Sequence, residues 1–327
     1  MLASCRKAEK SIDLEQYIFG SDGPIIEEWS ALLKEKARQG VKIRLLLDAL
    51  GSFSFFRSAL CTNLRDCGIA IAFHKVTLPP SIRRFIPFIL RDHRKLLVVD
   101  GREAHIGGVI IEERARDWRD TSVRLTGDIV ADCGTAFETA WDRALHMRPM
   151  GQVLSREGRS AFYLAGNSFH LQDKELYRII LRHIVSAKKD IFITTPYFSL
   201  TRDLRRALYF ARSRDVEVRI LLPRRSDNFL ADLLGRLYYR RLLRRGVRLF
   251  HYTGNILHAK TIVIDERFAS VGSCNFDWLS FRLNYELNVM SEGREFATEL
   301  REIFLRDIEE SPEVTLSTPI FRGFFSA

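Results

Sequence analysis

Hydrophobic positions along the chain fall into short continuous runs separated by amphipathic stretches. Four such runs, at 43–47, 96–99, 218–222 and 261–264, consist almost entirely of Leu, Ile and Val. Continuous apolar runs of this length are typical of strands that are buried on both faces and covered by helices. The pattern therefore predicts an α/β fold.

The order of these elements occurs twice. Residues 8–48 and 187–222 both follow the pattern strand, helix, strand, and each is followed by a further helix and short strand. Next come the segments HRKLLVVDGREAHIGG and HAKTIVIDERFASVGS, in which His-to-Asp is seven residues and His-to-Gly is fourteen in both copies. Matching offsets in otherwise different segments indicate a duplication. We predict two α/β halves, 1–150 with its motif at 93–100 and 151–327 with its motif at 258–265.

Composition narrows the class of protein. Of the 327 residues 46% are hydrophobic and 28% are charged, as in globular proteins, and the net charge of +10 favours polyanionic partners. The N-terminal segment lacks the apolar core of a signal peptide, and no run is long enough for a transmembrane helix. The five cysteines form no C-x-x-C pair, so we expect no structural metal. We also expect no cofactor.

Each repeated motif combines a histidine with a lysine two residues later. On a strand this spacing places His93 with Lys95, and His258 with Lys260, on one face. A lysine ammonium binds phosphate, while an imidazole attacks phosphorus or protonates a leaving oxygen. These four residues are candidate catalytic groups.

Further candidates lie downstream of each histidine. Asp100 and Asp265 close the motifs, where they either orient the lysines or hold the loop, and we include them with the catalytic group. Asp120 and Glu286, 27 and 28 residues after His93 and His258, are candidates to orient the imidazoles. Small residues at the following turns suit close approach of a phosphodiester, and we expect five of them to bind phosphate: Gly107, Gly108, Gly272, Ser273 and Asn275.

Together the two motifs, with YIF at 17–19, WRD at 118–120, PYF at 196–198 and VGSCNFD from 271, resemble the phospholipase D superfamily, and most closely its cardiolipin synthase branch. The resemblance covers nearly the whole chain. It implies a duplicated α/β/α sandwich with two pseudo-twofold-related halves, each containing a mixed, largely parallel sheet. It also implies one metal-independent site and a phosphohistidine intermediate, with His93 as nucleophile and His258 as acid.

Three positions depart from the pattern of the family. Ile110 and Leu279 stand where asparagine and arginine are usual, and Asp92 precedes His93 where asparagine is usual. The groups predicted to react are present in both halves, so the departures predict a site whose symmetry is only approximate.

The resemblance predicts a phosphatidyltransferase that makes cardiolipin from two phosphatidylglycerol molecules and releases glycerol. Hydrolysis of phospholipids and cleavage of nucleic acid are alternatives with the same chemistry, although the sequence offers no aromatic stacking platform for nucleic acid. We expect an anionic membrane surface as partner, no obligatory protein partner, and a peripheral location on the cytoplasmic side of the cell membrane.

Three segments combine basic and apolar residues. Residues 78–91 are predicted either to cover the active site or to lie in a bilayer interface. The run GRLYYRRLLRRGVR at 235–248 is either a solvated helix face or a patch for anionic lipid. Near the C-terminus, Phe321, Phe324 and Phe325 are candidate interfacial anchors.

Overall fold

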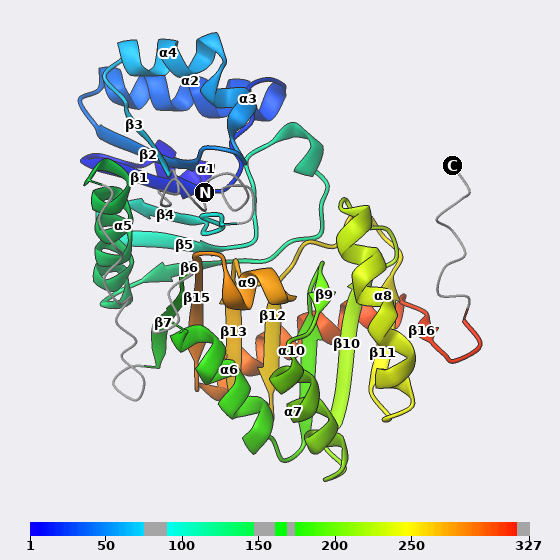
Figure 1. Cartoon of the computed structure of the whole chain (residues 1–327). Helices are drawn as coiled ribbons and strands as arrows, with labels where there is room; N and C mark the ends of the chain where they lie inside the picture. The colour runs from blue at the N-terminus through cyan, green and yellow to red at the C-terminus, as the bar shows by residue number, and fades with distance from the viewer. Residues whose placement is uncertain (75–89, 147–160, 169–173, 319–327) are drawn as a thin grey trace.

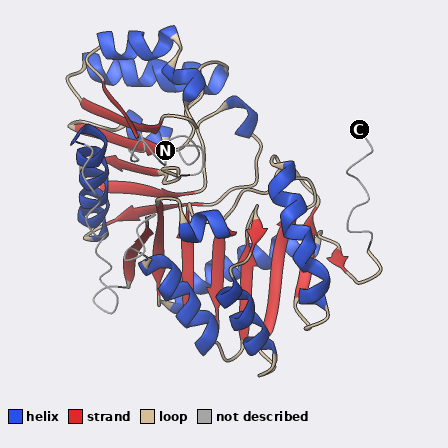
Figure 2. Cartoon of the chain, viewed as in Figure 1, coloured by secondary structure: helices blue, strands red, loops and turns tan. Residues whose placement is uncertain are grey.

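The computed structural model describes residues 1–74, 90–146, 161–168 and 174–318, and in one helix it leaves out the side chains of 229–232 and 234. Two large mixed sheets, covered by helices, form the two halves of the molecule (Figures 1 and 2). Residues 147–160 around the predicted boundary between the halves, most of the segment 78–91 and the C-terminal phenylalanines lie outside the described residues. The described residues include no helix that is long and apolar enough to cross a membrane.

The first half contains a six-stranded sheet with helices around it. Its elements are α1 (Leu2–Arg6), β1 (Ser11–Gln16), α2 (Pro24–Arg38), β2 (Lys42–Asp48), α3 (Phe53–Phe56), α4 (Ala59–Asp66), β3 (Ala70–His74), β4 (Leu96–Val99), β5 (Glu103–Gly107), η1 (Glu113–Ala115), β6 (Ser122–Thr126) and α5 (Ile129–His146).

The second half contains an eight-stranded sheet and a separate two-stranded one. Its elements are β7 (Phe162–Asn167), α6 (Glu175–Ser186), β8 (Asp190–Thr194), β9 (Phe198–Ser199), α7 (Arg202–Arg212), β10 (Glu217–Pro223), α8 (Phe229–Leu243), β11 (Arg248–Tyr252), β12 (Thr261–Ile264), β13 (Phe268–Gly272), β14 (Phe276–Asp277), α9 (Trp278–Arg282), β15 (Glu286–Ser291), α10 (Arg294–Glu309) and β16 (Glu313–Val314).

Strand order confirms the duplication. The first sheet runs β3-β2-β1-β4-β5-β6, and the second contains the equivalent series β11-β10-β8-β12-β13-β15. Two strands extend the second sheet, β16 beside β11 and β7 beside β15. Equivalent strands in the same order place the two histidine motifs at equivalent points of the two sheets.

The prediction of an α/β fold with a mixed sheet in each half is confirmed, but neither sheet is largely parallel. Only β1, β2 and β3 in the first sheet, and β8, β10 and β11 in the second, pair in parallel. The motif strands β4 and β12 pair antiparallel with both of their neighbours. Their continuous apolar runs reflect burial on both faces, which an antiparallel strand between two helical layers shares with a parallel one.

Three apolar clusters account for that burial. One lies between the first sheet and the helices α2 and α4, and another lies between the second sheet and the helices α6, α7 and α8. The third contains side chains of α5 and α10 together with residues of both sheets, such as Leu96, Ala104, Val263 and Val271. The two halves therefore share one core, which fixes the position of each motif relative to the other.

Candidate active site

The two histidine segments are held by backbone hydrogen bonds from the opposite half. The amide of His93 donates to the carbonyl of Tyr285 (3.0 Å), and the amide of His258 donates to the carbonyl of Arg119 (2.8 Å). Isolated parallel bridges join Asp92 to Tyr285 and Arg119 to Leu257. Each motif strand is thus preceded by a short segment that lies against the other half.

The residues that follow these two carbonyls are the predicted orienting carboxylates. Nδ1 of His93 lies 3.1 Å from both carboxylate oxygens of Glu286, and Nδ1 of His258 lies 2.6 Å from Oδ2 of Asp120. All four side chains are largely buried. The pairs therefore cross between the halves, and each imidazole depends on a carboxylate from the other repeat.

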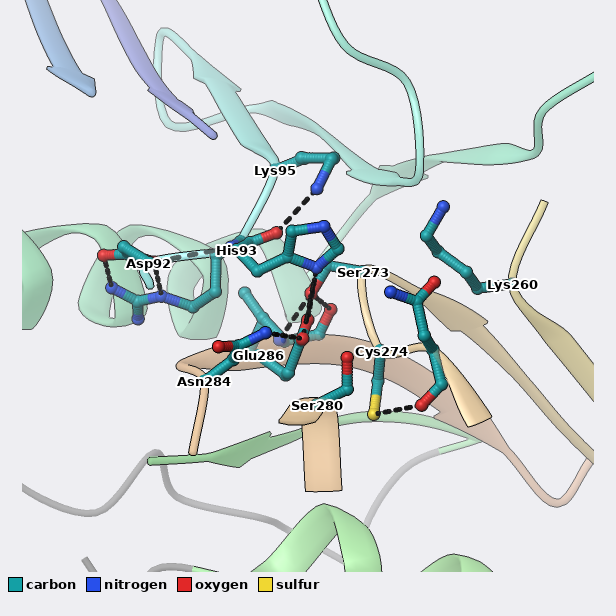
Figure 3. Close-up of polar contacts among 12 residues, drawn as sticks. Asp92, His93, Lys95, Lys260, Ser273, Cys274, Ser280, Asn284 and Glu286 are labelled. Atoms are coloured by element: carbon teal, nitrogen blue, oxygen red, sulfur yellow. Dashed lines mark hydrogen bonds and ion pairs between the residues drawn. The ribbon is translucent and has the colours of Figure 1, made fainter. Parts of the chain in front are cut away.

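The two lysines lie with the histidines. Nζ of Lys95 donates to the carbonyl of His93 (2.7 Å), and Nζ of Lys260 donates to the carbonyl of His258. Figure 3 shows Lys95 and Lys260 grouped around the His93 ring, although they come from different halves. Each lysine uses one of its three donors on a backbone carbonyl, which leaves donors for an anionic ligand.

Burial sets the charge of the two imidazoles. It lowers the pKa of His93, as does Lys95, while Glu286 opposes the shift. For His258, burial and the Lys260 ammonium lower the pKa to about 4. Both rings are therefore neutral at pH 7. With Nδ1–H donating to a carboxylate, Nε2 of each ring has a free lone pair for attack or proton transfer.

The pKa values of the two lysines and of Asp120 are also shifted from their usual values. Burial, followed by the neighbouring Lys260, lowers the pKa of Lys95 to about 7, and burial lowers that of Lys260 to about 8. Burial alone would raise the pKa of Asp120, but His258 and Lys260 bring it below its usual value. Lys95 and Lys260 are near enough for the charge of Lys260 to lower the pKa of Lys95. Two neighbouring cations in a buried site favour binding of an anion.

Ser273 and Asn275, two of the residues predicted to bind phosphate, differ in their hydrogen bonds. Ser273 donates to Oε2 of Glu286 (2.5 Å), so its hydroxyl orients the carboxylate that serves His93. Asn275 is buried, and its Oδ1 has no hydrogen-bond partner among the described residues. Its side chain therefore has unused capacity for a polar ligand.

The three glycines allow close packing between strands. A Cβ on Gly108 would lie 2.1 Å from Oδ1 of Asp120, and one on Gly107 would lie 2.4 Å from the carbonyl of Thr121. In the second half, a Cβ on Gly272 would lie 2.2 Å from Oδ1 of Asn288. Their small size positions Asp120 and the adjoining strands, which is a different role from the predicted contact with phosphate.

Asp100 and Asp265 lie at the opposite ends of the motif strands. Asp100 accepts hydrogen bonds from the amides of Glu9, Lys10 and Ser11 (2.9, 2.7 and 2.8 Å). Asp265 accepts equivalent bonds from the amides of 188–190 at 2.7 to 3.1 Å. Both residues have positive φ angles, 54° and 55°. Of the two roles considered for these residues, orienting the lysines or holding the loop, the contacts fit the second. We therefore assign Asp100 and Asp265 a structural role.

Aromatic side chains that were not among the predicted site residues flank both imidazoles. The ring centroid of Tyr17 lies 4.8 Å from that of His93, and the centroid of Trp118 lies 5.1 Å from that of His258. Tyr17 belongs to the YIF element and Trp118 to the WRD element. Both elements are among the motifs that resemble the family, so their aromatic residues could have been predicted to lie at the site from the sequence.

The two histidines differ in their immediate neighbours. Asp92 and Arg94 flank His93 and pair with each other, and Arg143 from α5 lies 2.6 Å from Asp92. The corresponding neighbours of His258 are Leu257 and Ala259, which are buried in the shared apolar cluster. A buried ionic network therefore supports one histidine and apolar packing supports the other, which places the departure at Asp92 inside that network.

This arrangement can perform phosphoryl transfer. It contains two neutral imidazoles with oriented rings and two lysines with donors available for an anion. In the described part of the chain, no three His, Cys, Asp or Glu residues are grouped as metal ligands.

Comparisons with known proteins agree with this geometry. The family model described as "Cardiolipin synthase, PLD-like domain" matches residues 1–141 and 180–308. A probable cardiolipin synthase of Bacillus subtilis is 32% identical over 95% of this chain and 63% of its own length. The cardiolipin synthase of Geobacillus kaustophilus is 32% identical over 95% of this chain and 64% of its own length. The chain thus spans less than two thirds of these relatives.

A solved structure shows the same fold. Phosphatidylserine synthase from Haemophilus influenzae superimposes with a TM-score of 0.73 at 15% identity, over 96% of this chain and 84% of the other. The match to the family model extends over both histidine motifs and both orienting carboxylates. The chain therefore belongs to the phospholipase D-like family of cardiolipin synthase domains.

Proposed function

We propose that this chain is a phosphatidyltransferase that forms cardiolipin from two phosphatidylglycerol molecules and releases glycerol. The lipid phosphate would bind between Lys95 and Lys260, with the Nδ2 amide of Asn275 as a further donor and its Oδ1 available to accept from a lipid hydroxyl. The reaction needs no cofactor, because the attacking group, the acid and the cationic groups are all side chains of the chain.

In the first step, Nε2 of His93 attacks phosphorus and the bond from phosphorus to the headgroup glycerol oxygen breaks. The leaving oxygen takes a proton from Nε2–H of His258 in its imidazolium form and departs as glycerol. Glu286 stabilises the positive charge that develops on His93, and Asp120 does the same for His258. The bound phosphate anion raises the pKa of His258 from its low value in the free protein and so favours the acid form.

In the second step, His258 is neutral and acts as base. It takes the proton from the terminal glycerol hydroxyl of a second phosphatidylglycerol, whose oxygen attacks the phosphorus bound to His93. The bond between phosphorus and nitrogen breaks, cardiolipin forms, and His258 returns to its protonated state. Water in place of this hydroxyl would give phosphatidic acid instead.

The observation that most strongly supports the proposal is the crossed pairing of the imidazoles, His93 with Glu286 and His258 with Asp120. It makes the two motifs parts of one site, with one histidine available for each of the two chemical roles. The choice of lipid follows the names of the relatives, which are cardiolipin synthases.

To test the proposal, the purified protein is incubated with phosphatidylglycerol vesicles in the presence of EDTA, and the lipid products are separated. Equal amounts of cardiolipin and glycerol are the expected result. Phosphatidic acid as the main product would replace the proposal with hydrolysis. Absence of lipid products together with cleavage of single-stranded DNA would refute both lipid activities.

A further inference from the structure

Helix α8 and the turn after it expose a basic stripe. Leu237, Arg240, Arg241, Arg244 and Arg245 follow a spacing of three, four, seven and eight residues, which places them on one helix face. All five are exposed, Leu237 by 59%. The helical geometry continues beyond α8, since the amide of Arg244 donates to the carbonyl of Arg240 (3.1 Å).

Helix α7 presents a similar stripe beside it. Arg202, Arg206 and Phe210 are exposed at intervals of four residues. Two cation–π contacts join the helices: Arg205 lies 5.2 Å from the ring centroid of Tyr238, and Arg245 lies 5.4 Å from that of Tyr209. The helices therefore form one continuous surface, which lies in front of the eight-stranded sheet in Figure 1, with α10 behind it.

Helix α9 joins this surface to the active site. Arg282 of α9 lies 3.5 Å from Asp203 of α7. Four residues after Arg282 comes Glu286, the partner of His93. The first two residues of α9, Trp278 and Leu279, are 49% and 44% exposed. We call α7, α8 with its following turn, and α9 the basic face.

Six arginines of the basic face differ from many others in the protein. Arg44, Arg119 and Arg248 each pair with a carboxylate at 2.6 Å. By contrast, no ion pair is found among the described residues for Arg202, Arg206 or the four arginines at 240, 241, 244 and 245. Six unpaired, solvent-exposed cations on one surface attract an extended polyanion.

We propose that the basic face docks on an anionic bilayer, with Trp278 and Leu279 inserted at the interface beside the active site. The choice of a bilayer rests on the proposed lipid substrate and on the exposed apolar residues, since a tryptophan and leucines among arginines suit an interface that is anionic outside and apolar within. Docking in this orientation brings the site to the lipid that it acts upon.

The test measures sedimentation with vesicles of phosphatidylcholine alone and of phosphatidylcholine mixed with phosphatidylglycerol. The protein used is the His258→Ala variant, so that binding is separated from turnover. We expect binding to the mixed vesicles only. Each arginine near an anionic surface contributes about five-fold in affinity, so changing Arg240, Arg241, Arg244 and Arg245 together to Gln should weaken binding by at least about ten-fold.

A matched control removes the same charge elsewhere. Arg38, Arg102, Arg267 and Arg294 are also exposed, but they lie outside the basic face, on α2, on α10 and in the turns after β4 and β12. Changing these four to Gln should alter binding by less than about three-fold. Equal losses in the two sets would overturn the proposal, because they would show a dependence on net charge alone. Unchanged binding in the α8 set would overturn it too, as would a preference for single-stranded DNA that the α8 set abolishes.

Tryptophan fluorescence gives an independent readout of insertion. Of the four tryptophans, Trp29 is buried, Trp118 and Trp141 are partly buried, and Trp278 is 49% exposed, so Trp278 should give most of the response to a bilayer. We expect a shift of the emission to shorter wavelength with the mixed vesicles, and loss of that shift in Trp278→Phe while sedimentation is retained. A shift that persists in Trp278→Phe would remove α9 from the docking surface. Failure to form cardiolipin by the active protein, with docking intact, would refute the proposed function alone.

Discussion

In the candidate active site, each imidazole comes from one half of the chain and is held by a carboxylate from the other half. The sequence shows similar offsets from each histidine to a carboxylate, 27 and 28 residues, and these offsets indicate which residues are equivalent. They do not show which carboxylate serves which histidine, because that depends on how the two halves pack. The backbone bonds from His93 to Tyr285 and from His258 to Arg119 determine the crossing.

Because the pairs cross, the two carboxylates should affect different steps. We expect Glu286→Gln and Asp120→Asn to lower turnover by about 10²- to 10⁴-fold, since each removes the charge that fixes and stabilises an imidazole. With phosphatidyl-p-nitrophenol, whose leaving group needs no acid, Asp120→Asn should keep most of the initial p-nitrophenol burst and Glu286→Gln should lose it. Stopped-flow absorbance measures the burst.

Glu299→Gln is the matched control, because Glu299 is exposed on α10. It should leave both phases unchanged. The reverse pattern, with the burst lost in Asp120→Asn and kept in Glu286→Gln, would assign the nucleophile to His258.

Binding of the phosphate should depend on pH through the lysines. Their lowered pKa values, about 7 for Lys95 and about 8 for Lys260, mean that the free protein loses positive charge as the pH rises from about 7 to about 9. We expect the inhibition constant of a soluble phosphodiester, whose own charge is constant over this range, to rise over the same interval. Lys95→Arg remains charged and should show a weaker dependence. Affinity independent of pH in both proteins would contradict this account of the lysines.

Most helices and strands, and their repeated order, could be predicted from the sequence. The apolar runs at 96–99 and 261–264 are strands β4 and β12, and the repeated order of elements is the order found in both sheets. The direction of the strands could not be predicted from these runs, because antiparallel β4 and β12 are as buried as a parallel strand would be. Asp100 and Asp265 also required the structure, since their amide partners lie some 90 and 75 residues away.

Asp100 and Asp265 should therefore contribute to stability rather than to chemistry. Asp100→Asn keeps a residue type that tolerates a positive φ but loses the charge that three amides share, and we expect it to lower the free energy of unfolding by about 1 kcal/mol. Its kcat/KM should stay within about two-fold of the parent value wherever the variant is folded. Urea unfolding and the lipid assay measure the two quantities.

Asp215→Asn is the control for this substitution. Asp215 also has a positive φ, 61°, and it is exposed. It should change neither stability nor activity. A folded Asp100→Asn variant with strongly reduced kcat/KM would return Asp100 to the catalytic group.

On the scale of the whole molecule, a single apolar cluster joins the two sheets through α5 and α10. The repeat in the sequence predicted two halves but not this shared core, because contacts between halves leave no periodic signal within either one. Two further histidines, His74 and His251, are also buried, and Nδ1 of His74 lies 3.8 Å from Asp92 of the ionic network beside His93. Burial lowers the pKa of His74 to about 3 and that of His251 to about 4.

These buried histidines predict a loss of stability in mild acid. Their pKa values are lowered in the folded state, so between about pH 6.5 and 4 the unfolded chain binds more protons than the folded one. The free energy of unfolding should therefore fall as the pH drops through that window, by at most about 1.4 kcal/mol per pH unit for each histidine. His251→Gln should reduce the slope of the free energy of unfolding against pH by up to about 1.4 kcal/mol per pH unit. An unchanged slope would show that His251 is protonated in the folded state over this range.

We propose that one site shared by both halves uses His93 as nucleophile and His258 as acid and base. The most direct measurement is mass spectrometry of His258→Ala and His93→Ala after mixing with phosphatidyl-p-nitrophenol. We expect His258→Ala to release about one equivalent of p-nitrophenol and to retain a phosphatidyl group on His93, because the base of the second step is missing. His93→Ala should form no adduct. An adduct on His258 in His93→Ala, or continued turnover by that variant, would contradict the account.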